Sequence, residues 1–447
     1  MRRPVWALHV FVVGLALHNF LMAELWDAGL RGTGLTVVSA WKEALLALAL
    51  VLVVRARGRL PYDGTGTDRL ALSFGALVVL YALLPQHWLG GSATHKGVLY
   101  GLRDDLVPVG AYFLGRGLDL SLAEMRRLGA TIVLTAGGVA AFGLVDIYAI
   151  PLSWWRSSGA PGWFHEQLGF TYHGLSYLPE NFVYNTGNEH PLRRLVSTFL
   201  SPLASSYLLV VALILVTAWV VRLPPRRGRM IVVAAGTLAL LFAGLLWTHS
   251  RSSYLALALG LITFAAARRG RRAAFAAAAA VILVAGALFV KAYPQIAPTT
   301  SFTQTELAYQ RAHALGSGPA VSAGGAEDAS TSSHWRSLKA GIRTVVHHPQ
   351  GFGLGNAGST AARTNVTIQA GESTYTQLGA DTGLLGALVF VAWSLLLLRW
   401  ALSCWTWVGA SLAAVLALGL QTDVIGVPWL AYVLWALAGA CVLRTDL

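Results

Sequence analysis

The chain is dominated by apolar stretches that are long enough to cross a lipid bilayer. An α-helix rises about 1.5 Å per residue, so roughly 20 apolar residues span the roughly 30 Å of hydrocarbon in a membrane. About twelve such stretches recur along the sequence. Their apolar cores are residues 5–21, 35–54, 70–84, 98–115, 128–150, 203–221, 230–247, 253–267, 273–290, 378–398, 404–420 and 429–443. The sequence therefore predicts an all-α polytopic membrane protein with about 12 transmembrane helices.

Composition supports the membrane class. Hydrophobic residues make up 55% of the 447 residues and charged residues only 12%, which is too apolar for a soluble chain of this length. Both cysteines, Cys404 and Cys441, fall inside apolar stretches, where burial as small hydrophobic side chains is expected. We therefore expect neither a disulfide nor a cysteine metal site.

The net charge of +13 would suit a nucleic-acid-binding protein only if it formed one basic surface. Instead, the arginines gather in alternate connections between the apolar stretches. They are Arg55, Arg57, Arg59 and Arg69, then Arg116, Arg126 and Arg127, then Arg222, Arg226, Arg227 and Arg229, then Arg268, Arg269, Arg271 and Arg272. This positive-inside pattern predicts a multi-pass protein of a bacterial cytoplasmic membrane with both termini in the cytoplasm, and no nucleic-acid partner.

Two connections on the predicted outer side are long. The predicted order is five transmembrane helices, a first outer loop, four helices, a second outer loop and three helices, at residues 1–150, 151–202, 203–290, 291–376 and 377–447. Long loops carry function more often than stability, and an enzyme that acts on a lipid-linked substrate needs such a cap over the membrane surface.

The second loop contains one predicted helix. Residues 299–333 are rich in Ser, Thr, Gly and Ala and predict irregular chain. Residues 334–347, with Ser332 or Ser333 as the N-cap, predict an amphipathic helix that could lie along the membrane surface. Its cationic stripe, open to an anionic ligand, consists of Arg336, Lys339 and Arg343 with His347. Pro349 and the glycine-rich segment 351–355 then predict a tight turn.

Three short stretches place ionisable groups where an apolar helix meets the predicted outer surface, a costly position unless the groups are used. The first runs from Arg193 and Arg194 through Ser-Thr-Phe to Pro202. The second is the Thr-His-Ser-Arg turn that ends at Arg251. In the third, Glu372 and the serine after it are followed by nine residues and then Gly-Leu-Leu-Gly.

With these motifs, residues 193–398 resemble the superfamily of O-antigen polymerases (Wzy type) and O-antigen ligases (WaaL type). The resemblance rests on an arginine followed by Ser/Thr-Phe and Pro, the Ser-Arg turn, a His-Pro with a glycine turn, and the final Gly-x-x-Gly helix start. It implies a polytopic enzyme with a GT-C-like architecture. It also implies that Arg194, or its neighbour Arg193, and Arg251 bind the pyrophosphate of an undecaprenyl-linked glycan. A guanidinium suits that role because its planar donors match phosphate oxygens.

The resemblance also points to a catalytic base. Ligases of this superfamily have a histidine, followed by Asn, Ser or Gln, at the position held here by Glu372. This difference favours a polymerase or another glycan transferase, with a carboxylate that accepts the proton of the attacking hydroxyl. His334, at the start of the amphipathic helix, is a second candidate for the base.

Each of these residues also has an ordinary structural interpretation. Arg194 and Arg251 could anchor helices at the headgroups, and Glu372 could stabilise a helix N-terminus. Arg103, Asp104 and Asp105 predict an internal charge pair. A larger alternative is a metal-dependent glycosyltransferase that holds a divalent ion with Glu24 and Asp27 in the first outer loop. The arginine pattern instead predicts an enzyme with no metal site and no cofactor.

We therefore predict an inverting glycosyltransferase that polymerises undecaprenyl-pyrophosphate-linked oligosaccharide units on the outer face of the membrane. Its expected partners are that donor, an acceptor glycan or glycolipid, membrane lipids and a chain-length regulator. One alternative is a ligase that transfers the glycan to the lipid A core. The other is a polysaccharide flippase, which would need a polar pathway through helices whose middles are mostly apolar.

Overall fold

The computed structural model describes residues 3–185, 189–221, 228–268, 272–313, 329–371 and 373–442. The described chain is almost entirely helical, and its one sheet has two short antiparallel strands, β1 (Val183–Tyr184) and β2 (Leu192–Arg193). Within these described ranges, eight helical segments are long and apolar enough to cross a membrane. The predicted all-α polytopic class is confirmed, and the protein is an integral membrane protein.

Every predicted apolar stretch coincides with a helical segment. In chain order these are α1 (Trp6–Asp27), α2 (Gly32–Ser39) with α3 (Trp41–Arg57), α4 (Gly66–Leu83), α5 (His95–Leu118), α6 (Leu122–Ala149), α9 (Pro202–Val220), α10 (Gly228–Trp247), α11 (Arg251–Ala267), α12 (Arg272–Ile296), α16 (Thr374–Cys404), α17 (Thr406–Leu418), and η7 (Leu430–Leu434) with α18 (Trp435–Gly439). The shorter apolar helices among them are α11, α17 and the η7–α18 run.

Several helix starts follow directly from local sequence. Ser121 caps α6 in a capping box, in which its hydroxyl accepts from the Glu124 N–H and the Glu124 carboxylate accepts from the Ser121 N–H. Thr65 and Asp68 make the same arrangement at α4. At α9, the Ser201 hydroxyl accepts from the backbone of Ala204, and proline occupies the first helical position. Such caps satisfy backbone donors that a helix leaves open at its N-terminus.

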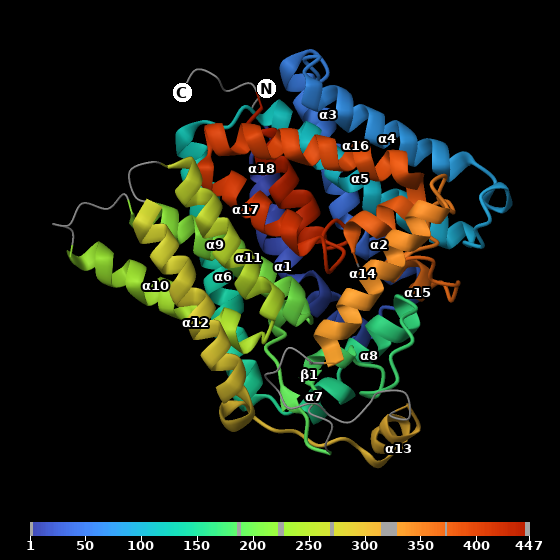
Figure 1. The fold of residues 1–447 in the computed structure, drawn as a ribbon, viewed down its shortest axis with the longest axis vertical. Coiled ribbons are helices and arrows are strands. Elements are labelled where there is room, and N and C mark those ends of the chain that lie inside the picture. The colour runs from blue at the N-terminus through green and yellow to red at the C-terminus, as the bar shows by residue number, and fades with distance from the viewer. Residues whose placement is uncertain are drawn as a thin grey trace.

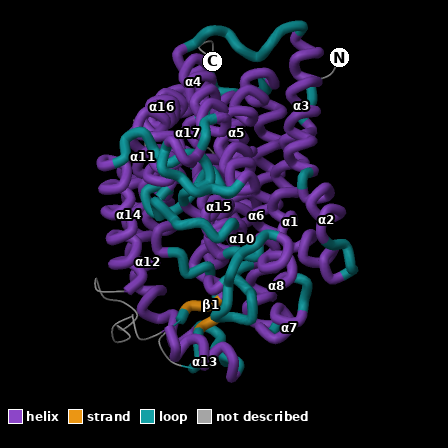
Figure 2. The backbone as a smooth tube through the Cα atoms, turned by 90° about the vertical axis from the view of Figure 1, so that its right-hand side faces the viewer, coloured by secondary structure: helices purple, strands orange, loops and turns teal. Residues whose placement is uncertain are grey.

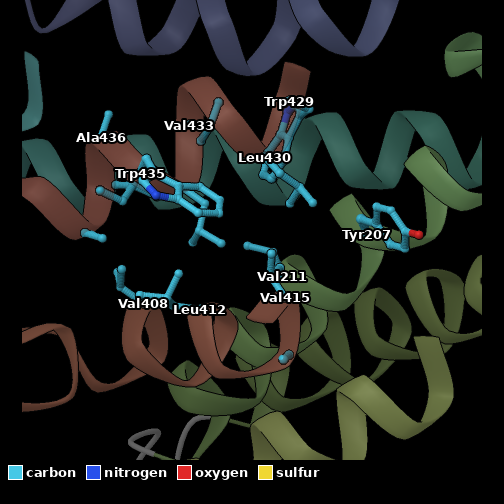
Figure 3. Packing of buried hydrophobic residues seen from close by; sticks show 14 of the residues in the cluster. Tyr207, Val211, Val408, Leu412, Val415, Trp429, Leu430, Val433, Trp435 and Ala436 are labelled. Carbon is cyan, nitrogen blue, oxygen red and sulfur yellow. The ribbon is translucent and has the colours of Figure 1, made fainter. Parts of the chain in front are cut away.

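The centre of the bundle is a buried hydrophobic cluster between α9, α17 and the η7–α18 segment. Figure 3 shows Val211 of α9 beside Val415 of α17, with Trp435 of α18 above Val408 and Leu412. Burial of such side chains stabilises the interior by about 1.5 to 3 kcal/mol each relative to exposure to water. The C-terminal segments α17 and η7–α18 therefore belong to the same hydrophobic core as the earlier membrane helices.

The two ends of the molecule differ in Figures 1 and 2. Both described termini lie at one end, where Arg116 Nη1 donates to the carbonyl of Val442 and Arg3 donates to the carbonyl of Leu118. The opposite end carries the segments of the first long connection and α13. These segments are α7 (Leu152–Ser157), α8 (Ala160–Gly162), η2 (Trp163–Gln167), η3 (Glu180–Phe182), β1 and β2, whereas η4 (Ser197–Phe199) bonds to the middle of α1 and α6. We call this the loop-covered end.

The second long connection contains more helix than the sequence predicts. Helix α13 (Gln304–His313) lies within the segment predicted to be irregular. That prediction is wrong because Thr303 and Glu306 form an N-terminal cap, and the Glu306 carboxylate is paired with Arg156 of α7. This distant contact adds stability that composition does not reveal.

Helix α14 (Ala329–His347) begins before the predicted start at His334. Serine and threonine can occupy the interior of a first turn as well as its cap, so their presence does not fix the boundary. The helix packs against α16, and Figures 1 and 2 show it running along the side of the bundle rather than across its end. Its packed face includes Gly341, which lies so close to Thr376 of α16 that any larger residue at position 341 would clash with the threonine side chain.

The predicted glycine turn is held by a buried asparagine. Gly351, Gly353 and Gly355 all have positive φ angles, as a tight turn requires. The Asn356 side chain, fully buried, donates to the carbonyls of Phe352 and Gly353 and accepts from the backbone of Ser92. The turn leads into α15 (Gly358–Arg363), which lies before α16.

Candidate phosphate site and catalytic residues

Arg193 and Arg194 have different environments although they are adjacent. Arg193 lies in β2, with its side chain only 3% exposed, and its Nη2 lies 3.3 Å from Asp146 Oδ1 of α6. Its Nη1 donates to the carbonyl of Ile150 at 3.0 Å. Successive side chains of an extended chain point in opposite directions. Arg193 is therefore part of a buried structural ion pair, and of the two residues predicted for phosphate it is the one already matched by a carboxylate.

Arg194 turns toward the connection between α10 and α11. Its backbone N–H donates to the carbonyl of Phe182, and its Nε donates to the carbonyl of Thr248 at 3.0 Å. The side chain is half-buried. Burial lowers the pKa of this guanidinium, and the nearby positive charge of Arg251 lowers it as well. An anion placed here would relieve both effects, because it would provide the missing opposite charge.

Arg251 is the first residue of α11, so it lies where backbone N–H groups and the helix dipole favour negative charge. Its guanidinium lies 6.0 Å from the ring centroid of Tyr184 in β1, and its Nη2 lies 3.5 Å from the Tyr184 hydroxyl. Since β1 pairs with β2, the strand pair brings Tyr184 and Arg194 to the same turn. The structure thus brings the predicted residues Arg194 and Arg251 together.

His249 lies two residues before Arg251, in the turn between α10 and α11. The charges of both Arg194 and Arg251 act on its side chain. Its ring stacks on Tyr293 of α12 at 4.1 Å with an interplanar angle of 16°, and the Tyr184 ring packs against it at 4.7 Å. The side chain is 5% exposed, and neither ring nitrogen has a hydrogen-bond partner among the described residues. The residue also has a positive φ of 50°. A buried polar group without a partner costs free energy and is typical of a site that awaits a ligand.

His249 is uncharged at neutral pH. Burial lowers the pKa of the imidazole to about 3, with further lowering by Arg194 and Arg251. A neutral imidazole can donate one hydrogen bond and adds no positive charge to the pair of guanidiniums. Sequence reasoning assigned this residue no role. The available signal was its position between Thr248 and Arg251 in a turn that joins two apolar helices.

His334 and the start of α16 carry the second group of predicted site residues. His334 is half-buried and shares a face of α14 with Gly341 and Val345, the face that packs on α16. One turn farther along that face, Ser337 lies against Gly371, so a side chain at Gly371 would clash with it. Glu372 lies outside the described residues. His334 is therefore on the helix face turned toward the chain that enters α16.

The entry to α16 is fixed by several contacts. Ser373 Oγ donates to the carbonyl of Gly419 at 3.0 Å, and the backbone N–H of Thr374 donates to the same carbonyl. Gly383, the first glycine of the Gly-x-x-Gly motif, has φ 71° and ψ 172° inside α16. That conformation is accessible to glycine and strongly disfavoured for other residues, and it produces a kink. The motif thus bends the helix, with nine residues between the Glu372-Ser373 pair and the kink at Gly383.

A family model described as O-antigen ligase matches residues 236–391. Over this segment, about a third of the sequence, the chain is similar to O-antigen ligases. No curated protein matches the chain. The matched segment includes Arg251, His334 and the Gly383 kink, while Arg194 lies before it.

The cationic residues of α14 lie away from its packed face. Arg336, Lys339 and Arg343 are exposed, and Lys339 Nζ lies 5.0 Å from the ring centroid of Trp335. Trp335 and Ile342 are exposed, whereas Val345 is buried and lies against Gly379 of α16. Gly341 and Val345 make the contact with α16, and the cationic stripe stays on the outside.

The alternative metal site gains no support from the described residues. Glu24 and Asp27 are exposed on the last turns of α1, and no group of three or more His, Cys, Asp or Glu side chains in the described ranges is arranged to hold a metal ion. The predicted internal charge pair is present, since Arg103 Nη2 lies 2.7 Å from Asp104 Oδ1. Lys42 and Glu43 of α3 lie beside this pair and line the same small cavity.

Proposed function

We propose that this protein transfers a glycan from an undecaprenyl-pyrophosphate donor to a hydroxyl of an acceptor glycan on the outer face of the bacterial cytoplasmic membrane. The observation that carries the proposal is the convergence of Arg194, Arg251 and the unpartnered His249 at one turn near the loop-covered end. Two guanidiniums and a neutral donor suit the oxygens of a pyrophosphate.

The proposed reaction is a single displacement. An acceptor hydroxyl oxygen forms a bond to the anomeric carbon while the bond from that carbon to the pyrophosphate oxygen breaks. The hydroxyl proton passes to Glu372 or His334, and the configuration of the anomeric carbon inverts. Negative charge grows on the leaving pyrophosphate in the transition state, where Arg194 and Arg251 stabilise it. The products are the extended glycan and undecaprenyl pyrophosphate.

A polymerase is the favoured form of this activity because Glu372 stands where the ligases of the superfamily have histidine. The alternative ligase would use the same donor and site, with the lipid A core as acceptor. A flippase has less support, since Arg194 directly follows β2 and Arg251 begins α11, so both lie near one end of the helices rather than along a path through them. A neighbouring gene for a chain-length regulator would favour the polymerase.

Reconstitution tests the function directly. The purified protein in vesicles is expected to convert lipid-linked repeat units into a ladder of longer products. Addition of lipid A core in place of a second repeat unit separates the alternatives, because a single transferred product on that acceptor identifies a ligase. Movement of the donor across the vesicle membrane with no new glycosidic bond would identify a flippase and contradict the proposal.

Transfer is expected to survive chelation by EDTA, because the proposed phosphate ligands are arginines. The measurement compares ladder formation before and after EDTA treatment, with a transferase known to require Mg²⁺ as the control for chelation. Loss of activity that Mg²⁺ or Mn²⁺ restores would instead favour a metal site at Glu24 and Asp27.

The orientation in the membrane has its own test. The arginine distribution predicts that single cysteines at positions 187 and 318 react with an impermeant thiol reagent from outside the cell. Cysteines at positions 228 and 270 are expected to react only after permeabilisation. A cytoplasmic position for residue 318 would place the second long connection on the wrong side for this chemistry.

A further inference from the structure

An exposed tyrosine at the loop-covered end is held in a strained backbone conformation. Ser176 and Tyr177 have φ angles of 53° and 70°, in the left-handed region that residues other than glycine rarely occupy. Tyr177 nevertheless keeps 43% of its surface exposed. Such strain persists only where surrounding contacts impose it, and it concentrates at functional sites.

A buried carboxylate binds Ser176, the residue before Tyr177. Glu306 of α13, only 1% exposed, accepts from the Ser176 hydroxyl at 2.7 Å and from Arg156 Nη2 at 2.6 Å. It also accepts from the backbone N–H of Thr303 at the start of its own helix. Segments from both long connections are thereby joined beneath Tyr177, which makes the exposed ring part of a rigid surface.

Three further rings accompany Tyr177. His165 stacks on it at 4.2 Å with an interplanar angle of 27°, and its Nδ1 lies 2.9 Å from the carbonyl of Phe170. The His173 ring lies 5.8 Å from Tyr177 and 5.6 Å from Tyr309 of α13. We refer to His165, His173, Tyr177 and Tyr309 as the aromatic platform.

Polar groups border the aromatic platform. Any side chain at Gly174 would meet the amide of Gln310 and the carboxylate of Glu180, so these two groups lie beside the platform segment. Gln310 Oε1 accepts from Asn185 Nδ2 at 3.3 Å. A set of aromatic faces with a few amide and carboxylate groups around it suits a sugar ring, which has an apolar C–H face and hydroxyls at its edge.

The border of the platform is connected to the phosphate site through one strand end. Asn185, which contacts Gln310, directly follows Tyr184, which contacts Arg251 and His249. A glycan attached to a pyrophosphate at Arg251 begins at that same strand. The donor glycan is thus better placed to reach the platform than an acceptor that enters beside α14 and the start of α16.

We propose that the aromatic platform binds a sugar ring of the donor glycan, with Tyr177 as its main stacking surface; this assignment rests on the proposed glycan transfer. The platform would recognise the carbohydrate, and Arg194 with Arg251 would recognise the pyrophosphate. Recognition by two separate surfaces distinguishes a lipid-linked glycan from the glycan-free lipid pyrophosphate that the reaction releases.

The test measures binding of two probes to the full-length protein in lipid nanodiscs. The probes are the lipid-linked repeat unit of the host and undecaprenyl pyrophosphate without sugars. Tyr177→Asn removes the ring while retaining a residue that tolerates positive φ, and we expect it to weaken binding of the lipid-linked repeat unit about tenfold, as loss of one aromatic contact would. Binding of undecaprenyl pyrophosphate should be unchanged.

Matched variants complete this test. Tyr177→Phe keeps the ring and should bind both probes as the wild type does, as should Tyr62→Asn, which removes an exposed tyrosine in the connection between α3 and α4. Tyr309→Ala is a second, independent test of the platform, since Tyr309 lies on α13. It should also weaken binding of the repeat unit and leave binding of undecaprenyl pyrophosphate unchanged. The proposed role of the platform would be wrong if Tyr177→Asn bound the repeat unit as tightly as the wild type does, or if it bound both probes equally more weakly. Unchanged binding of both probes by Arg251→Ala would instead overturn the phosphate site.

Discussion

Replacement of Arg251 with alanine is expected to abolish nearly all glycan transfer while the protein remains folded. Arg251 occupies the first position of α11 and contacts Tyr184, so its guanidinium is positioned before the substrate arrives. Loss of one charge-assisted contact to a leaving group in a water-poor site costs about 2 to 4 kcal/mol of transition-state stabilisation. The rate should therefore fall between about 30-fold and several hundred-fold.

Arg251→Lys separates charge from geometry. Lysine retains the positive charge but loses the planar set of donors that can bind two phosphate oxygens at once. We expect this variant to be expressed at the wild-type level and to lose most of its activity. The readout is the ladder formed from purified lipid-linked repeat units at matched protein amounts.

Arg311 provides the matched control for both substitutions. It lies on α13 at the same end of the molecule, and its side chain is exposed in a surface ion pair with Glu189. Such pairs contribute about 0 to 1 kcal/mol, so Arg311→Ala and Arg311→Lys should retain activity. Wild-type ladders from Arg251→Ala would show that Arg251 is only an interfacial anchor, and the proposed pyrophosphate site would then be wrong.

The bundle could be predicted from sequence because membrane helices are determined largely by local composition. A run of about 20 apolar residues must be helical in hydrocarbon, whatever its neighbours are. The loop-covered end follows a different rule. Helix α13 depends on a contact between Glu306 and the distant Arg156, and a polar segment gives no local sign of such a contact.

The phosphate site could be predicted only in part. Arg194 and Arg251 stood out because charged residues beside apolar helices are costly, but the sequence left Arg193 and Arg194 as alternatives. The strand pair β1–β2 separates them, because it directs Arg193 to Asp146. His249 was missed since nothing in a single sequence indicates that Tyr293, more than forty positions later, stacks on its ring.

Glu372→Gln is expected to reduce transfer by a factor of roughly 10² to 10⁴, the usual contribution of a general base. Glutamine has nearly the same shape but cannot accept the proton of the attacking hydroxyl. Ser337 lies against Gly371, and Ser373 Oγ donates to the carbonyl of Gly419, so the residues on either side of Glu372 have defined neighbours. The kink at Gly383 should be unaffected by this substitution.

His334→Asn is the matched substitution at the other candidate base. His334 lies on the packed face of α14, so its loss is expected to lower activity less than about tenfold if it only supports the entry to α16. Glu372→His supplies the histidine that ligases of the superfamily have at this position, and it should recover part of the activity lost in Glu372→Gln. Initial rates with saturating donor separate these effects from donor binding.

The pattern across the three variants decides which residue is the base. A large loss in Glu372→Gln, partial recovery in Glu372→His and a small loss in His334→Asn would assign proton transfer to Glu372. The reverse order would assign it to His334, because α14 would then direct its imidazole toward the acceptor. Equal wild-type rates in Glu372→Gln and His334→Asn would remove both residues from the mechanism. Transfer of the hydroxyl proton to solvent would then have to suffice, with catalysis carried by the stabilisation of the leaving pyrophosphate at Arg194 and Arg251.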